Sequence, residues 1–155
     1  MCPRLTKYTE EIGKIKTKKY LDQSYWAKPV PTFGDPRAKL LIIGLAPAAN
    51  GGNRTGRIFT GDSSGDWLIK ALFETGFANK PQSISKDDGL LLKGAYLTAV
   101  AKCAPPQNKP NPAELLNCSQ YLMSEIKILE MTTKVIVTLG KTAFDAYCRV
   151  SNSEV

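Results

Sequence analysis

The chain has 155 residues and a mass of 16.9 kDa, which is enough for one domain with a hydrophobic core but too little for two of ordinary size. With 43% hydrophobic and 23% charged residues, it has the composition of a soluble globular protein, and its apolar runs are too short for a membrane span. The sequence contains no histidine, which excludes Ser–His and Cys–His nucleophile pairs and every zinc site that needs imidazole. Carboxylate, amide, hydroxyl, thiolate and lysine groups remain for chemistry.

Positive charge is concentrated in the first part of the chain. The net charge is +7 and the isoelectric point is near 9.3. Residues 1–60 carry eleven Lys and Arg against four Asp and Glu, whereas residues 61–155 carry ten of each. This distribution favours a polyanionic partner, and the alternative is a basic helix that is simply solvated. Because no apolar signal core follows Met1, we expect a cytoplasmic location and no structural disulfides.

The first third of the chain predicts a helix, a connector and a strand. Apolar residues recur at spacings of three and four from Leu5 through Tyr8 to Ile15, with lysines on another face, which predicts an amphipathic basic helix. Prolines in residues 25–36 favour an extended connector. Residues 39–44 (KLLIIG) form a short apolar run, which is typical of a strand buried on both faces.

The later part of the chain continues the alternation of helices and strands. The predicted elements are helix 66–75, strand 94–101, helix 112–130, a buried strand 134–139 and helix 141–150. The start of the helix that follows Asn111 is the most clearly specified, because Asn is a good N-cap, Pro112 occupies the first helical position and Glu114 the third.

This order predicts a single α/β domain over residues 1–155, with a central parallel sheet between two layers of helices. Ligands of such sheets bind beyond the carboxyl ends of the strands. The loops that follow Gly44, Lys102 and Leu139 all leave the sheet at those ends. Their unusual residues are therefore expected to meet on one rim.

A glycine-rich segment, residues 51–56 (GGNRTG), lies in the first of these loops. Glycines let backbone N–H groups approach an anion, so the segment permits a small-molecule phosphate-binding function. The spacing matches neither a P-loop nor a dinucleotide fingerprint. Nucleotide hydrolysis is therefore not supported.

Cysteines occur at positions 2, 103, 118 and 148. Cys103 follows a predicted strand and Cys118 lies about two turns into the next helix, so the loop between them allows the two to meet. They are either thiolate ligands of iron–sulfur or zinc, or small core residues.

One carboxylate stands out in the glycine-rich region. Asp62 follows Phe59-Thr60-Gly61, where a carboxylate beside an aromatic side chain could act on a small planar ligand. The alternative is an N-cap or turn residue, and the sequence leaves both interpretations open.

Four segments resemble one known family. They are residues 44–48 (GLAPA), 51–57 (GGNRTGR), 59–62 (FTGD) and 102–106 (KCAPP). Together with residues 2–5, 25–27, 29–31 and 33–36, they resemble the type b, or family 5, uracil-DNA glycosylases of archaea and bacteria. The resemblance extends in order over nearly the whole chain.

The resemblance implies a three-layer α/β/α enzyme of base-excision repair that flips uracil, or another deaminated base, out of DNA and hydrolyses its glycosidic bond. Asp62 corresponds to the proposed catalytic carboxylate, Asn108 to an amide of the catalytic site that also binds the base, and Phe59 to the aromatic that stacks on the base. The base pocket would also include Gly44, Leu45 and Ala46.

The implied partner is DNA, bound by a monomer. Arg54 and Arg57, together with the lysines near the N-terminus, are expected to contact phosphates, which would make binding sensitive to salt.

The resemblance also implies a structural [4Fe-4S] cluster bound by four cysteines. Cys2, Cys103 and Cys118 match three of the ligands. The first cysteine of the family's N-terminal pair is missing, because only Met1 precedes Cys2, and Cys148 matches no ligand. A three-thiolate site suggests a [3Fe-4S] or incomplete cluster, or an empty site.

Two departures from the family pattern concern the site. Asn50 stands where the family commonly has histidine, and the sequence ends at Val155, whereas the family continues through another strand to a His-Pro-Ser motif. Because the sequence ends at Val155, we expect a domain that lacks the C-terminal part of the family's domain. The second functional hypothesis is therefore a catalytically inactive DNA-binding remnant.

Overall fold

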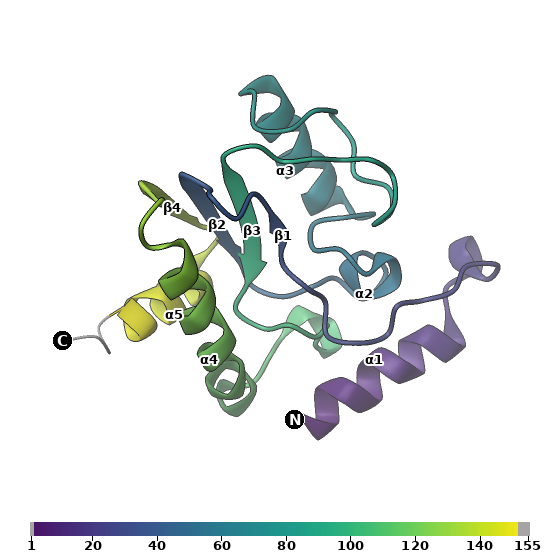
Figure 1. Ribbon diagram of the computed structural model, residues 1–155. Coiled ribbons are helices and arrows are strands. Elements are labelled where there is room, and N and C mark those ends of the chain that lie inside the picture. Colours follow the sequence, from purple (N-terminus) through teal and green to yellow (C-terminus); the bar gives the residue numbers. More distant parts are fainter. Residues whose placement is uncertain (1, 152–155) are drawn as a thin grey trace.

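The computed structural model describes residues 2–151 (Figure 1); Val155 lies outside this range. The main elements are α1 (Pro3–Ile15), β1 (Phe33–Gly34), β2 (Leu40–Gly44), α2 (Gly52–Thr55), α3 (Ser63–Glu74), β3 (Ala95–Ala99), α4 (Pro112–Leu129), β4 (Val135–Thr138) and α5 (Lys141–Ser151). Two single-turn 3₁₀ helices, η1 (Lys18–Tyr20) and η2 (Pro106–Asn108), lie in loops. Within residues 2–151, no helix is long and apolar enough to cross a membrane.

The four strands form one mixed sheet in the order β1-β3-β2-β4. Strand β2 pairs in parallel with β3 and β4, but β1 pairs antiparallel with β3. The sequence predicts that residues 25–36 form only a connector and that all strands of the sheet are parallel. Strand β1 corrects both predictions, because it lies within this segment and pairs antiparallel. A Cβ atom at Gly34 would lie 2.5 Å from the Ala95 carbonyl oxygen, so glycine permits this close pairing. Pro31 and Pro36 flank β1 and lack the N–H groups that a longer strand would need.

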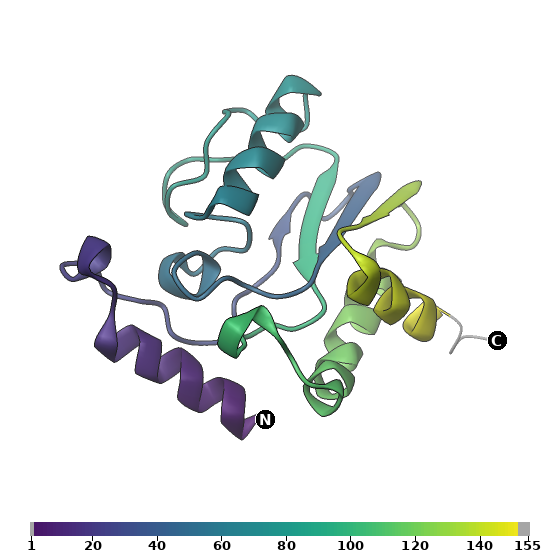
Figure 2. The same ribbon diagram turned by 180° about the vertical axis from the view of Figure 1, so that it is seen from behind.

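Helices cover both faces of the sheet, which confirms the predicted three-layer α/β/α architecture (Figures 1 and 2). One core lies between α3 and the sheet and includes Ile42, Ile69, Leu72 and Leu97. The other lies between α4, α5 and the sheet and includes Leu41, Ile43, Leu122 and Ala143. Successive residues of β2 serve opposite cores because side chains alternate along a strand.

Strand β4 is less buried than its apolar sequence predicts. Ile136 packs against the core beneath α4 and α5, whereas Val135 and Val137 on the opposite face are 54% and 38% exposed. Strand β4 is the outer strand of the sheet, and neither valine belongs to the core beneath α3. The prediction of a buried strand over residues 134–139 is therefore corrected, because only the face that carries Ile136 packs against a core.

Helix α1 lies beyond the carboxyl end of β3, beside α2 (Figures 1 and 2). Its Leu5 and Thr9 are buried, but Ile15 is 73% exposed, so the predicted apolar face does not extend to the end of the helix. The Arg4 guanidinium donates two hydrogen bonds of 2.7 Å to the carboxylate of Glu114. Glu114 also completes the predicted capping box of α4. This ion pair ties the basic helix to α4 at the rim of the sheet.

Candidate active site

A cavity of about 350 Å³ opens among the loops at the carboxyl end of the sheet. We call it the rim cavity. Its walls are Tyr8, Tyr20, residues 48–51, Gly61, Asp62 and residues 107–108. The predicted catalytic pair, Asp62 and Asn108, therefore lines one cavity although 46 residues separate the two positions.

Asp62 is held at the start of α3. Its Oδ1 atom accepts a hydrogen bond of 3.0 Å from the backbone N–H of Gly65, so the alternative that it is an N-cap is confirmed. The second oxygen lies against Gly51, where an added Cβ atom would be 2.0 Å from Oδ2. One carboxylate oxygen thus caps the helix while the other faces the loop that lines the rim cavity.

Asn108 is presented on a strained turn. Gln107 and Asn108 adopt left-handed backbone conformations, with φ angles of 54° and 55°. Two successive non-glycine residues of this kind are unusual, and such strain is concentrated at ligand sites. Both side chains are exposed on the cavity wall. The Asn108 amide can therefore offer both a donor and an acceptor to a ligand.

Phe59 belongs to the loop between α2 and α3, and its ring lies beside Gly44 at the end of β2. It is not part of the rim cavity wall. A Cβ atom at Gly44 would be 2.6 Å from the tip of the Phe59 ring, so this glycine makes room for the aromatic side chain. Leu45 and Ala46 follow as half-buried residues, and the Leu45 carbonyl accepts a hydrogen bond from Ala101. The structure brings Gly44 and Phe59 together. Of the residues predicted to bind the base, only Asn108 lies in the same cavity wall as Asp62; Gly44, Leu45, Ala46 and Phe59 do not.

The position of Arg57 corrects the prediction of a phosphate contact. Its side chain is 5% exposed and forms an ion pair with Asp88, with 2.8 Å between Nη2 and Oδ2. Burial raises the pKa of Asp88, but the Arg57 hydrogen bond and backbone N–H groups outweigh it, so the pKa lies well below its usual range. The Arg57 guanidinium is therefore used inside the protein, because its buried partner and neighbouring hydroxyls occupy its donors.

Arg54 is also used mainly to connect loops of the rim. Its guanidinium donates to the carbonyl oxygens of Asn50 and Gly61 and to the side chain of Gln23. It also lies 3.9 Å above the ring of Tyr20. These contacts hold the two loops that carry Gly51 and Asp62 side by side.

Three cysteines surround a second cavity, of about 820 Å³, between α1, α4 and residues 26–32. Cys2, Cys103 and Cys118 all line it, whereas Cys148 lies on α5. Burial raises the pKa of Cys103 to about 11, and the neighbouring Cys118 and Cys2 act in the same direction. The Cys103 thiol therefore stays protonated at neutral pH unless a positive partner binds it.

The cysteine arrangement does not fit a single metal ion. Among residues 2–151, no three His, Cys, Asp or Glu side chains are close enough to one another to hold one ion. The cavity also contains Lys102 and Glu125, whose Nζ and Oε1 atoms are 2.8 Å apart.

Comparison with known proteins identifies the family. The family model of the uracil DNA glycosylase superfamily matches residues 31–154. The chain belongs to the uracil DNA glycosylase superfamily. The match contains the sheet, both helical layers and the loops that carry Asp62 and Asn108.

Within this superfamily the chain is similar to proteins named type-5 uracil-DNA glycosylase. It is 49% identical to the protein of Thermus thermophilus over 146 residues, which is 94% of this chain and 65% of the relative. It is 45% identical to that of Pyrobaculum aerophilum (96% and 64%) and 46% identical to that of Mycobacterium tuberculosis (98% and 57%). The chain thus spans about three fifths of the length of these curated relatives.

Sequence reasoning missed some of the residues that line the rim cavity. Tyr8 is predicted only as part of the apolar face of a helix, and Tyr20 and Gln107 are not predicted at all. Asn50 is predicted as a departure from the family, and the structure shows its Oδ1 atom accepting a hydrogen bond of 2.7 Å from Tyr25. Tyr25 and Asn50 lie 25 positions apart, so no local sequence pattern predicts this hydrogen bond.

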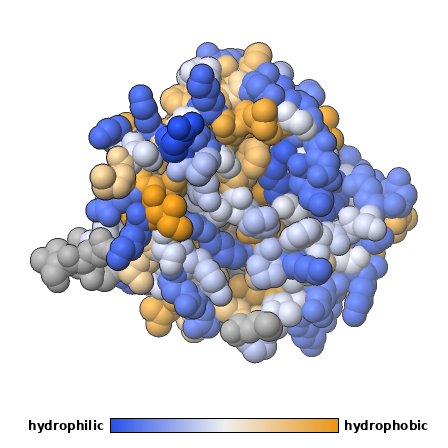
Figure 3. All heavy atoms as spheres, viewed as in Figure 1, coloured by the Kyte–Doolittle hydropathy of each residue, from blue (hydrophilic) through white to orange (hydrophobic). Residues whose placement is uncertain are grey.

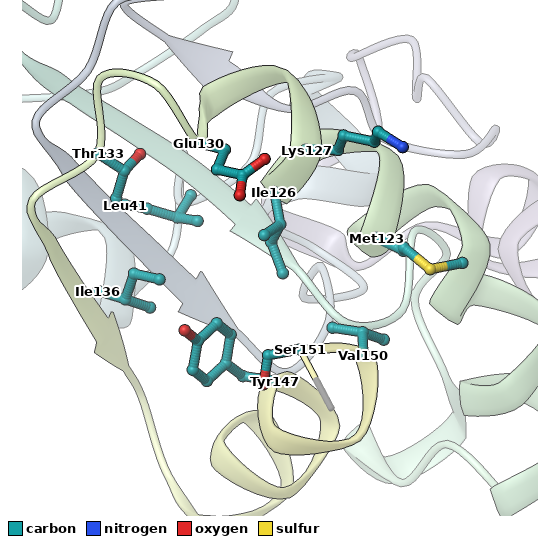
Figure 4. Close-up of a pocket in the computed structure, with 10 residues that line it drawn as sticks. All are labelled: Leu41, Met123, Ile126, Lys127, Glu130, Thr133, Ile136, Tyr147, Val150 and Ser151. Carbon is teal, nitrogen blue, oxygen red and sulfur yellow. The ribbon is translucent and has the colours of Figure 1, made fainter. Parts of the chain in front are cut away.

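A third cavity, of about 290 Å³, lies between α4, α5 and the sheet (Figure 4). Its wall includes aliphatic side chains, Lys127 from α4, Glu130 directly after the end of α4, and Tyr147 from α5. None of the predicted site residues of this superfamily member lines it. The rim cavity is therefore the better candidate for catalysis.

Proposed function

We propose that this chain catalyses the excision step of a uracil-DNA glycosylase, hydrolysis of the bond between a deaminated base and deoxyribose in DNA. The observation that carries the proposal is the convergence of Asp62 and Asn108 on one cavity at the rim of the sheet. A base inside a duplex is out of reach, so it must rotate out of the helix to enter such a site.

The two polar groups have complementary chemistry. Water attacks C1′ of the sugar, the C1′–N1 bond breaks, and the base leaves with the bonding electron pair. The proton that the water loses ends on the departing base, so the products are the free base and a sugar hydroxyl. Asp62, held by its cap bond to Gly65, can orient the water and stabilise positive charge on the sugar. The Asn108 amide can pair with the carbonyl and N–H edge of the base. A base that reaches from the rim cavity to the end of β2 would meet the ring of Phe59.

This function is tested by base release. We expect the 155-residue chain to release uracil from a duplex with one uracil, and to leave the same duplex with thymine intact. The comparisons lend no support to the inactive-remnant hypothesis, since the relatives are named as glycosylases. Binding of the uracil duplex without any base release would nevertheless favour that remnant. Nucleotide binding without DNA affinity would favour the phosphate-binding function that the glycine-rich segment permits.

The basic surface of α1 and η1 is proposed to contact DNA phosphates. Hydrophilic side chains cover this side of the molecule (Figure 3). Lys7, Lys14, Lys18 and Lys19 are exposed, whereas the two arginines of the glycine-rich loop are engaged in internal contacts. The proposal therefore assigns phosphate binding mainly to the lysines.

Duplex affinity should fall steeply with salt. Four phosphate contacts predict a loss of about 100-fold between about 50 and 200 mM monovalent salt, because bound counterions are released on association. Fluorescence anisotropy of a labelled duplex measures this slope. The double substitution Lys18→Ala and Lys19→Ala should reduce the slope by about 2, whereas Lys141→Ala on α5 should leave it unchanged. A slope that is flat in the unmodified protein would contradict this DNA-binding face.

We further propose that Cys2, Cys103 and Cys118 bind an iron–sulfur cluster with a structural role, connecting α1 to α4 and the loop after β3. When bound, such a cluster would supply positive charge that keeps the thiols deprotonated. The proposal is supported by the three thiols that line one cavity.

The cluster proposal predicts a difference between cysteines. Anaerobically purified protein should contain iron and sulfide and absorb in the visible region. Cys103→Ser or Cys118→Ser should abolish most of the iron content, because each removes one ligand. Cys148→Ser, on α5, should retain it. Iron content that is equally low in all proteins would contradict the proposal.

The molecule is proposed to act as a monomer, and a cytoplasmic location stays a prediction.

A further inference from the structure

A loop between α3 and β3 packs against the segment that precedes Asp62. The side chain of its Asp88 is 8% exposed and forms the ion pair with Arg57. Asp88 also accepts hydrogen bonds from the backbone N–H groups of Ile84 and Leu90. Removing two charges from water is unfavourable, and it is compensated only where geometry and further hydrogen bonds are good. This pair meets both conditions, so its position is well defined.

Two buried hydroxyls connect the ion pair to the active-site segment. Arg57 donates from Nε to the Thr60 hydroxyl over 3.0 Å and from Nη2 to the Ser83 hydroxyl over 2.6 Å. The two hydroxyls are themselves 2.6 Å apart, and Thr60 and Ser83 are 0% and 2% exposed. The Gly61 N–H donates to the Ser83 carbonyl over 3.1 Å. The network thus ends one residue before Asp62.

The backbone held by this network is strained. Phe59 has a φ of 50° and Gly61 a φ of 77°, so two left-handed residues flank Thr60. The Phe59 conformation is strained and persists only where the surroundings enforce it, whereas glycine adopts a positive φ at no steric cost. The segment also passes very close to α3, because a Cβ atom at Gly65 would lie 2.4 Å from the Phe59 carbonyl oxygen. Small changes at Thr60 would therefore move both Phe59 and Asp62.

We infer that the Arg57–Asp88 ion pair, through the hydroxyls of Thr60 and Ser83, positions the segment 59–62 so that the Asp62 carboxylate faces the rim cavity. Arg57 and Thr60 are positioning residues, because they act through Asp62. The inference about catalysis rests on the proposed glycosylase function, whereas the inference about positioning is independent of it.

The test removes the hydroxyl without changing the shape of the side chain. Thr60→Val lacks the hydroxyl, and Thr60→Ser restores it. Thr75→Val is the matched control, since the Thr75 hydroxyl donates to a backbone carbonyl at the opposite end of α3. Asp88→Asn removes the charge and keeps the volume. Three quantities are measured: amide hydrogen exchange at Gly61 and Gly65, the single-turnover rate of base release, and duplex affinity.

In Thr60→Val, exchange at Gly61 and Gly65 should rise about tenfold, because the local structure opens more often. The single-turnover rate should fall about 30-fold while duplex affinity changes by less than about twofold, because the loss affects chemistry and not binding. Asp88→Asn should show the same pattern. Thr60→Ser and Thr75→Val should behave like the unmodified protein.

Unchanged exchange at Gly61 and Gly65 in Thr60→Val would overturn the positioning role. An equal loss of rate in Thr60→Ser would also overturn it, because the restored hydroxyl should rescue the rate. If the unmodified protein releases no base, the exchange measurement alone decides the positioning role, and the failure belongs to the proposed function. If Asp88→Asn does not fold, the Thr60 variants still decide.

Discussion

Replacement of Asp62 by alanine is expected to lower the single-turnover rate of uracil release by about 10³-fold. The loss follows from removal of the carboxylate that orients water and stabilises positive charge on the sugar. Alanine also removes the cap of α3, in which Asp62 accepts from Gly65, so part of its effect is a loss of stability of about 1 kcal/mol. The rate is measured in single-turnover assays, with enzyme in excess over a uracil duplex and the reaction quenched at successive times.

Asp62→Asn separates the two roles of this residue. Asparagine caps helices as well as aspartate does, so the melting temperature should stay close to that of the unmodified protein. Its amide carries no charge, so the rate should still fall by about two to three orders of magnitude. An asparagine variant that retains the full rate would show that the carboxylate is only a cap.

Gly51→Ala should cause the second large loss of base release, of about 100-fold. The new Cβ atom would lie 2.0 Å from Oδ2 of Asp62, so the carboxylate would have to move away from its position. A displacement of about 1 Å in a reacting group is enough for a loss of this size. Thermal melting and single-turnover assays together distinguish displacement from unfolding.

Gly52→Ala is the matched control for this substitution. Its Cβ atom would approach Pro47 at 3.1 Å and would have no close contact with Asp62. We expect a rate within about fivefold of that of the unmodified protein, since the reacting group does not move. Equal losses in both variants would mean that the loop as a whole, and not the contact with Asp62, determines the effect.

Much of the fold could be predicted because its signals are local. The capping box of α4 lies within four consecutive residues, and it is present as predicted at Asn111 and Glu114. The apolar run of residues 39–44 predicts β2 in the same way. Strand β1 has only two residues, which is too short for any periodic pattern. The exposure of Val135 depends on which helices cover the outer strand, which no local pattern specifies.

The candidate site was predictable only in part, for the same reason. Asp62 and Asn108 lie in loops that leave the carboxyl ends of strands, and parallel strands bring such loops together. The function of Arg57 depends on Asp88, which is 31 residues away. An arginine in a glycine-rich loop predicts a phosphate contact, but its buried partner reverses that prediction. Gly51 likewise serves the close approach of a carboxylate, which the sequence does not distinguish from a phosphate cradle.

The proposed function requires that Asp62 and Asn108 act on one flipped base in the rim cavity. It is tested most directly by NMR with a duplex that carries 2′-fluoro-deoxyuridine, whose fluorine disfavours a positively charged sugar and so slows bond cleavage. We expect the side-chain amide signals of Asn108 and the backbone signals of Gly51 and Asp62 to shift on binding. Signals of Thr133 and Ile136, around the cavity beneath α4 and α5, should not. Shifts confined to that second group, with none at Asp62 and Asn108, would show that the base does not bind in the rim cavity.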